Sequence, residues 1–571
     1  KIDDFFTHAL GAGTVIARTA HQPISERVLS AADEYGYMIL YESGWCFSSK
    51  LKFPEFRDNS LVEIRDMLEI AYRHPSVCAW SLGNEVPYYN HNAAPLEVEI
   101  YDWLKANDKH GRPVSPQSGD FSGGTFVKTD ICDFHDYIGQ ATDWLGFRKG
   151  LADYRAFKEK KYKEPGLFNT RAIALGFETV GYTWNVNEDK SFVRGNLQHY
   201  LNYTKKESSW GAPNGIGCAG TVPLFKAVGP DASNECLAWM GKRVFELIRN
   251  HGWWQGYAAW SSTPFPYWRR WTQEIYPTLA LPGGDLPPTH PFADEPTEYT
   301  VRVHNSRDSV LSGATLKFSL ALPGGTEKDL ATMEIPEIAD FKSFEGKTTL
   351  VFPVANEAQL RLRVVKDGKT VGQNYYDMSS RSKKDLEAPF ATPPKEAYLL
   401  ETDSAESVRL TWFLLSKGFG IKLHELKSLE EAKDNSIVVI PYEMDPQGVE
   451  ISDALMKTLG EKGVTVFMLE QNSSAAFLPG GMNLFDGPLS FSDIVIPSHP
   501  VFKGLDWTDF DVWNNAHNGK VVNYYVGPAN EAMLACHGGT LYKPKNVGAT
   551  LLEGKVGKGR LIINQLLAVE S

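Results

Sequence analysis

Two glutamates that follow short apolar stretches are the residues of this chain best suited to do chemistry. Val77–Leu82 leads into Asn84 and Glu85, and Ala172–Phe177 leads directly into Glu178. Hydrolysis of a glycosidic bond needs two such carboxyl groups, one to protonate the leaving oxygen and one on the opposite side of the anomeric carbon. An adjacent asparagine can hydrogen-bond a sugar 2-hydroxyl in the transition state. Taken alone, the Asn-Glu dipeptide is better explained as the cap of a following helix.

The second carboxylate is chosen by its position after a strand. Glu178 closes an apolar stretch 93 residues after Glu85, whereas the neighbouring candidates Glu164 and Glu188 do not. We therefore predict Glu178 as the partner of Glu85.

Strand and helix patterns alternate over residues 1–285. Amphipathic stretches at Ser25–Tyr35 and Leu61–Arg73 have helical spacing. The expected strands are Thr14–Ala17, Tyr37–Tyr41, Val77–Leu82, Ile131–His135, Ala172–Phe177 and Gly256–Trp260. Repeated β–α units of this length indicate a (β/α)₈ TIM barrel, whose active site lies at the carboxyl ends of its strands.

Two further domains are expected after the barrel. The Pro- and Gly-rich segment 281–291 ends the first pattern, and short strands of period two over 286–385 predict an immunoglobulin-like β-sandwich. A second Pro-rich linker begins at Ala388. Over 386–571, strands at 436–441 and 464–469 alternate with helices near 408–417 and 451–461, which indicates a flavodoxin-like α/β sheet.

Composition restricts the partners. The net charge of −12 argues against nucleic acid as the main partner, because phosphate binding depends on Lys and Arg. No apolar run is long enough to span a membrane. The 15 Trp and 24 Tyr suit sugar-stacking surfaces, although large cores use them equally well. The six cysteines lack metal-site spacing; Cys218 and Cys236 could pair in an oxidising compartment.

Two strings of this sequence resemble glycoside hydrolase family 2, which includes β-galactosidases, β-glucuronidases and β-mannosidases. The string from His74 to Glu85 looks like the acid/base signature of that family. Upstream, Arg18-Thr-Ala-His21-Gln-Pro23 and the segment 32–42 are similar to its second and third barrel strands. The resemblance covers about 1–285 and implies a retaining exo-β-glycosidase acting on an oligosaccharide or glycoside, with β-galactosidase preferred over β-glucuronidase.

The resemblance also implies roles for individual residues. Glu85 would be the general acid/base and Glu178 the nucleophile, with Asn84 on the 2-hydroxyl. The implied substrate-binding residues are His21, His135, Tyr137, Trp184 and Trp260, of which Tyr137 would hydrogen-bond the nucleophile and Trp260 would form a sugar platform. Core positions for His21 and Tyr137 are the plain alternatives.

The sequence departs from the family pattern at positions that would indicate a metal site or the identity of the sugar. The stretch after Glu42 lacks the acid and histidine of the magnesium-dependent β-galactosidases, so no metal and no cofactor is expected. The Asn-x-Lys motif of glucuronidases is not evident after Trp260, and Arg269-Arg270 could hold a carboxylate or be a solvated pair. The sugar therefore stays open.

The two ends of the chain carry further expectations. Arg18-Thr-Ala-His21 matches the second barrel strand, so the first has no counterpart and the barrel is expected to be N-terminally incomplete. The last domain is similar to the glutamine-amidotransferase-like appendages of some β-galactosidases. It lacks a cysteine at the expected elbow and is predicted to be non-catalytic, with a possible role in a homo-oligomer. A periplasmic or secreted location is weakly favoured. A non-catalytic carbohydrate-binding scaffold is the alternative from a different functional class.

Overall fold

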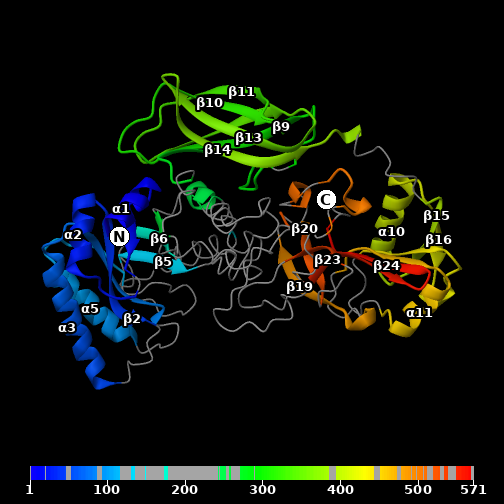
Figure 1. The fold of residues 1–571 in the computed structure, drawn as a ribbon, viewed down its shortest axis with the longest axis horizontal. Helices are drawn as coiled ribbons and strands as arrows, with labels where there is room; N and C mark the ends of the chain where they lie inside the picture. The colour runs from blue at the N-terminus through cyan, green and yellow to red at the C-terminus, as the bar shows by residue number, and fades with distance from the viewer. Residues whose placement is uncertain are drawn as a thin grey trace. The chain divides into compact units, whose positions relative to one another are not determined.

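The structure is a computed structural model. It describes residues 2–19, 21–46, 53–86, 93–115, 130–135, 148, 173–177, 242, 245–251, 256–258, 271–288, 290–384, 394–442, 450–471, 478–489, 492–494, 496, 498–505, 507–510, 513, 519–527, 533–537 and 548–567. Among these, the residues up to Gln273 form one compact unit and those from Glu274 a second, and the two are described separately (Figure 1).

The first unit is built on parallel strands. One sheet has the order β1-β2-β3-β4 and the other β5-β6-β7, with every pair parallel. The strands are β1 (Ile16–Arg18), β2 (Met38–Cys46), β3 (Val77–Asn84), β4 (Val114–Ser115), β5 (Ile131–His135), β6 (Ile173–Phe177) and β7 (Gly256–Ala258). Because β4 neighbours β5 and β7 neighbours β1, the described strands follow one another around a TIM-barrel-like ring.

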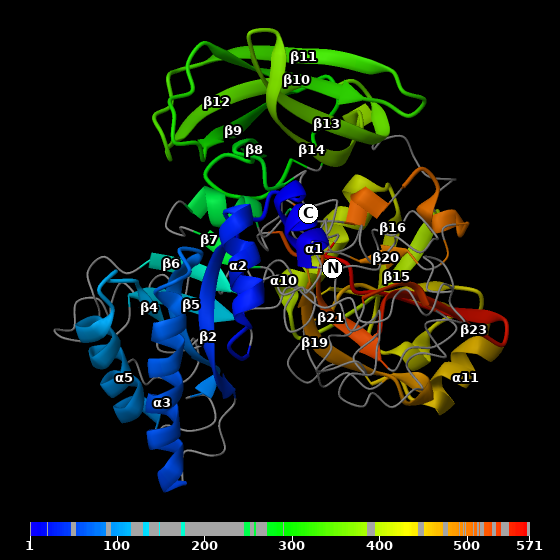
Figure 2. The same cartoon turned by 60° about the vertical axis from the view of Figure 1, so that its left-hand side comes forward.

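Helices cover these strands (Figure 2). They are α1 (Ile2–Gly11), α2 (Glu26–Tyr35), α3 (Pro54–Ala71) and α5 (Ala94–Asn107). One apolar core joins Leu29 of α2, Ile64 of α3 and Ile100 of α5 to Trp80 of β3, all of them almost completely buried. The left-handed Gly36 ends α2, and its backbone N–H caps the helix, so the chain turns directly into β2.

The predicted strands of the barrel agree with the structure in position and differ at their ends. The strand predicted over Val77–Leu82 continues to Asn84 as β3. The strand predicted over Tyr37–Tyr41 continues to Cys46 as β2. The two-residue strand β4 was not predicted, because Val114 and Ser115 are too short a pattern to show a period.

The second unit begins with a sheet of seven strands. Its antiparallel groups β11-β10-β13-β14 and β8-β9-β12 meet through one parallel pairing of Gly372 with Ile275. The strands are β8 (Ile275–Ala280), β9 (Pro296–Asn305), β10 (Ala314–Ala321), β11 (Glu327–Ile335), β12 (Ser343–Val351), β13 (Ala355–Lys366) and β14 (Lys369–Ser380). A single core contains buried residues of both groups, such as Val301 and Leu360. We predicted a domain boundary at residue 285, after the strand that is now β8. In the structure β8 pairs with β9 and so belongs to the second unit, and the Pro- and Gly-rich linker lies between these two strands.

The last sheet is mixed. Five parallel strands lie in the order β16-β15-β17-β18-β24, which is 2-1-3-4-5 in chain order, an order known from doubly wound sheets. They are β15 (Glu396–Leu400), β16 (Lys422–Leu426), β17 (Ile437–Ile440), β18 (Thr465–Met468) and β24 (Gly559–Asn564), with α10 (Ala405–Phe413) and α11 (Asp453–Glu461) between strands. The antiparallel additions β19 (Asn483–Leu489), β20 (Asp493–Ile494), β21 (Val522–Gly527), β22 (Met533–His537) and β23 (Gly548–Val556) were not predicted. None of the described helices is both long and apolar enough to cross a membrane.

A buried ion pair secures the start of β3, and we expect its loss to destabilise the first unit. Asp108 bonds Arg112 at 3.1 Å and accepts from Trp80 Nε1 at 2.9 Å, while Arg112 donates to the Val77 carbonyl. Asp108→Asn should lower the free energy of unfolding at pH 7 by roughly 3 kcal/mol, because it leaves the guanidinium buried without its counter-charge. Chemical denaturation measures this.

The same pair gives that loss a pH dependence. Burial would raise the pKa of Asp108, but the hydrogen bonds from Trp80 and the His110 backbone and the charge of Arg112 bring it below its ordinary value. A carboxyl with a lowered folded pKa contributes stability above its unfolded pKa of about 3.9 and loses it as the pH falls. The difference between wild type and Asp108→Asn should therefore shrink below about pH 4. A difference that stays constant down to pH 3 would contradict this.

Candidate active site

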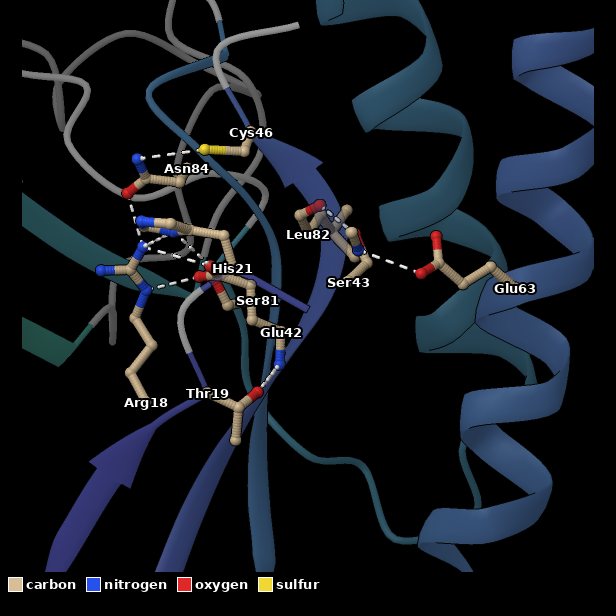
Figure 3. Close-up of polar contacts among 11 residues, drawn as sticks. Arg18, Thr19, His21, Glu42, Ser43, Cys46, Glu63, Ser81, Leu82 and Asn84 are labelled. Atoms are coloured by element: carbon tan, nitrogen blue, oxygen red, sulfur yellow. Dashed lines mark hydrogen bonds and ion pairs between the residues drawn. The ribbon is translucent and has the colours of Figure 1, made fainter. Parts of the chain in front are cut away.

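The candidate site lies at the carboxyl ends of β1, β2 and β3. Arg18 is the last residue of β1 and Asn84 the last of β3, and Glu85 follows immediately. Because parallel strands end at the same edge, the side chains of Arg18 and Asn84 meet although they are 66 positions apart in the chain. Figure 3 shows Arg18 reaching both Glu42 and Asn84.

Glu42 is the centre of this polar network. It has no exposed surface, and it forms a double contact with Arg18: Nε donates to Oε2, and Nη2 donates to Oε1 at 3.2 Å. The Ser81 hydroxyl donates to Oε2 at 2.6 Å, and His21 Nδ1 lies 3.1 Å from Oε1. The Glu42 backbone N–H donates to Thr19 Oγ1 at 2.9 Å. Every part of the residue is thus held by a neighbouring strand or loop.

These contacts keep Glu42 ionised. Burial on its own would raise the pKa of the carboxyl, but the Arg18 charge and the hydrogen bonds from His21, Arg18 and Ser81 lower it below the ordinary value. The site therefore contains a buried carboxylate neutralised by a guanidinium whose side chain is only 4% exposed.

Asn84 and Glu85 owe their placement to the way β3 ends. Asn84 is 2% exposed; its carboxamide oxygen accepts from Arg18 Nη2, and its nitrogen lies 4.0 Å from Cys46 Sγ. Burial raises the pKa of the Cys46 thiol, so it is held in the neutral form there. Glu85 has a φ of 49°, in the left-handed region that non-glycine residues seldom adopt. The backbone therefore leaves the extended conformation of β3 at Glu85.

An irregularity in β2 brings its end into register with β3. Glu42 pairs with Ser81 but Trp45 pairs with Gly83, so β2 contains one extra residue between them. Two contacts hold this bulge: the Ser43 hydroxyl donates to the Leu82 carbonyl, and the Gly44 backbone N–H donates to Glu63 Oε1 of α3 at 3.0 Å (Figure 3). The bulge is followed by Cys46 opposite Asn84.

The structure accounts for some of the predicted site residues. It places His21 and Asn84 around the Arg18–Glu42 pair, and Glu85 directly follows Asn84 in the chain. His135 ends β5, where its register partner is Phe177, the last residue of β6 and the one before Glu178. The predicted residues Glu178, Tyr137, Trp184 and Trp260 lie outside the described residues.

Arg18 and Glu42 were quoted in the sequence motifs but were not predicted as site residues. The signal that could have found them is a charged residue at the end of each of two consecutive apolar strands, since buried charges occur in pairs. Among the described residues, no group of three or more histidine, cysteine or carboxylate side chains could hold a metal ion. The expectation that no catalytic metal is used stays a prediction.

Comparison with known proteins gives a partial match. Residues 9–168 match the family model of the TIM barrel domain of glycosyl hydrolases family 2. A β-galactosidase from Vibrio cholerae is 32% identical over 131 residues, which are 22% of this chain and 12% of that protein. A β-glucuronidase from Bacteroides fragilis is 25% identical over 159 residues, 27% of this chain and 22% of that protein. The chain thus aligns with less than a quarter of the length of these curated relatives.

A solved structure gives a weaker likeness. The β-D-mannosidase from Dictyoglomus thermophilum superimposes with a TM-score of 0.44 at 12% identity, over 66% of this chain and 48% of that one.

Gly83 gives a test of the strand packing that builds this site. A Cβ at this position would lie 2.7 Å from Trp45 Cβ and 2.9 Å from Val86 Cγ2. Gly83→Ala should lower stability by about 1–3 kcal/mol and displace the two residues that follow it. Thermal unfolding and the affinity for a sugar ligand would both report the change. Gly11→Ala is the matched control, since nothing lies within 4 Å of a Cβ there; equal effects of the two substitutions would contradict the packing argument.

Proposed function

We propose that this chain, which contains a glycosyl hydrolase family 2 TIM barrel domain matched over residues 9–168, is a retaining exo-β-glycosidase. The observation that carries the proposal is the placement of Asn84 and Glu85 at the end of β3, beside the buried pair of Arg18 and Glu42. A polar, charge-balanced group at the carboxyl ends of barrel strands is where this fold performs chemistry.

The proposed mechanism is double displacement. Glu178 attacks the anomeric carbon while Glu85 protonates the leaving oxygen, and a covalent glycosyl-enzyme results. The first step requires Glu85 in its protonated form and Glu178 as a carboxylate. Glycosylation removes the charge of Glu178, so Glu85 can then release its proton and act as the base toward water.

The register of β5 and β6 supports Glu178 in this role. His135 of β5 pairs with Phe177 of β6, and Phe177 of β6 pairs with Ala258 of β7. All three strands are parallel, so Glu178 follows a strand whose carboxyl end is shared with its neighbours. We keep Tyr137, His135, His21, Trp184 and Trp260 as proposed substrate-binding residues.

The sugar is proposed from the relatives. A terminal β-galactoside is the first choice and a β-glucuronide the second, because proteins of both activities are among the curated relatives. The alternative from another class is a carbohydrate-binding scaffold that uses the same pocket without hydrolysis.

We also propose identities for the two domains of the second unit. The seven-stranded sheet would be an immunoglobulin-like sandwich, supported by its two antiparallel groups around one core. Residues 394–567 would be a flavodoxin-like domain of the glutamine-amidotransferase type without its own catalysis, supported by the 2-1-3-4-5 order of the parallel strands. Its use in a homo-oligomer is part of this proposal.

A mechanism-based label tests the nucleophile. A 2-fluoro β-glycoside with a good leaving group should react once with the protein, because the fluorine slows the second step more than the first. Peptide mass spectrometry should find the sugar on Glu178, and Glu178→Ala should abolish labelling. The variants Glu164→Ala and Glu188→Ala are controls that should be labelled like wild type. Labelling of either competitor in place of Glu178 would disprove the assignment.

The leaving group tests the acid. Glu85→Ala should reduce kcat about 10²–10⁴-fold on a glycoside with an alkyl leaving group, which needs protonation. The reduction of the first chemical step should be much smaller for a nitrophenyl glycoside, whose leaving group is stable as an anion. Steady-state and pre-steady-state rates on the two substrates measure this difference. If wild type hydrolyses none of the galactosides, glucuronides and mannosides offered but still binds them, the scaffold alternative replaces the enzyme.

A further inference from the structure

The double contact between Arg18 and Glu42 restricts the guanidinium more than a single ion pair would. Two nitrogens of Arg18 point at the two oxygens of one carboxylate, and this carboxylate is itself fixed by Ser81. Both side chains are almost completely buried, at 4% and 0% exposure. A planar guanidinium held in this forked way keeps one orientation.

The fixed guanidinium in turn determines the orientation of the Asn84 carboxamide. Arg18 has only hydrogen-bond donors, so the atom of Asn84 that faces Nη2 must be the carbonyl oxygen. The NH₂ group then points the other way, where Cys46 Sγ lies 4.0 Å from the nitrogen. On the side away from Arg18, Asn84 therefore presents hydrogen-bond donors and no acceptor.

We propose that Glu42 is a positioning residue that acts on the substrate 2-hydroxyl through Arg18 and Asn84. This inference rests on the proposed glycosidase function and on the proposed contact of Asn84 with that hydroxyl. The chain of contacts runs from the carboxylate of β2 to the guanidinium of β1 and then to the carboxamide of β3. Glu42 touches no reacting atom in this scheme.

A carboxylate is required at this position because Arg18 needs two acceptors. Glutamine would offer one oxygen and one NH₂ group, and the NH₂ group would oppose a guanidinium N–H. Arg18 would lose one of its two contacts and the charge that balances it. The guanidinium could then rotate, and Asn84 would no longer be held with its NH₂ group toward the substrate.

The test compares Glu42→Gln with wild type on two substrates, the aryl β-glycoside that wild type hydrolyses best and its 2-deoxy counterpart. On the parent glycoside kcat should fall about tenfold or more with a small change in KM, because the 2-hydroxyl contact strengthens in the transition state. On the 2-deoxy glycoside the variant and wild type should differ by less than about threefold. In an Asn84→Ala background, Glu42→Gln should also cost less than about threefold, since the contact it supports is already absent.

The controls separate positioning from general destabilisation. Asp108→Asn breaks a comparable buried carboxylate–guanidinium pair at the opposite end of β3, and any activity it loses should be lost equally on both substrates. Arg18→Lys keeps the positive charge beside Glu42 but cannot contact Glu42 with two nitrogens and also reach Asn84. It should reproduce the selectivity of Glu42→Gln if the latter proves too unstable to purify.

The outcomes distinguish this proposal from the proposed function. If wild type is active and Glu42→Gln lowers kcat by the same factor on both substrates, the positioning role is refuted while the glycosidase function stands. If wild type cleaves no glycoside, the proposed function fails, and a crystal structure of Glu42→Gln still decides the positioning. Arg18 and the Asn84 carboxamide should move in that structure, and their unchanged placement would overturn the inference.

Discussion

A buried charge pair, Arg18 with Glu42, is the constraint on which the described part of the site depends. Removing two charges from water costs several kcal/mol per ion, and only good geometry with further hydrogen bonds offsets this cost. Here the carboxylate has further contacts from two separate places, Ser81 on β3 and His21 after β1, while Thr19 accepts from the Glu42 backbone N–H. The pair can exist only when β1, β2 and β3 are all in place. Folding of the barrel edge and formation of the site are therefore the same event.

The backbone around this pair is shaped to suit it. The extra residue in β2 changes which side chains face the partner strand, so that Glu42 opposes Ser81 before the bulge and Cys46 opposes Asn84 after it. The close approach of Trp45 to Gly83 is possible only because Gly83 has no side chain. Helix α3 contributes as well, since Glu63 accepts from the freed Gly44 backbone N–H. Irregular backbone at the rim of a barrel is a common way to direct side chains toward a site.

The sequence predicted the parts of this arrangement that are local. The apolar run before Asn84 and Glu85 marks a strand with polar residues at its end, and β3 has that form. The run before Glu178 likewise becomes β6. The ion pair between Arg18 and Glu42 could not be predicted. It depends on the register of neighbouring strands and on a β-bulge, and no residue pattern in the sequence indicates either of them. In the sequence, Glu42 was noted only as the end of the segment 32–42 and the beginning of a stretch that lacks a metal-binding pair. The short strand β4 and the antiparallel additions to the last sheet were missed for the same reason: tertiary pairing rather than local pattern forms them.

The left-handed backbone of Glu85 has a consequence for the evolution of this protein. An L-residue other than glycine pays about 1–2 kcal/mol to adopt this conformation, and asparagine or glycine would occupy position 85 with less strain. Glutamate at this turn therefore costs the fold stability that glycine would not cost. Glu85→Gly would relieve this strain and at the same time remove the carboxyl group that we propose as the acid/base, so a screen for thermostability alone would favour loss of the proposed catalytic group.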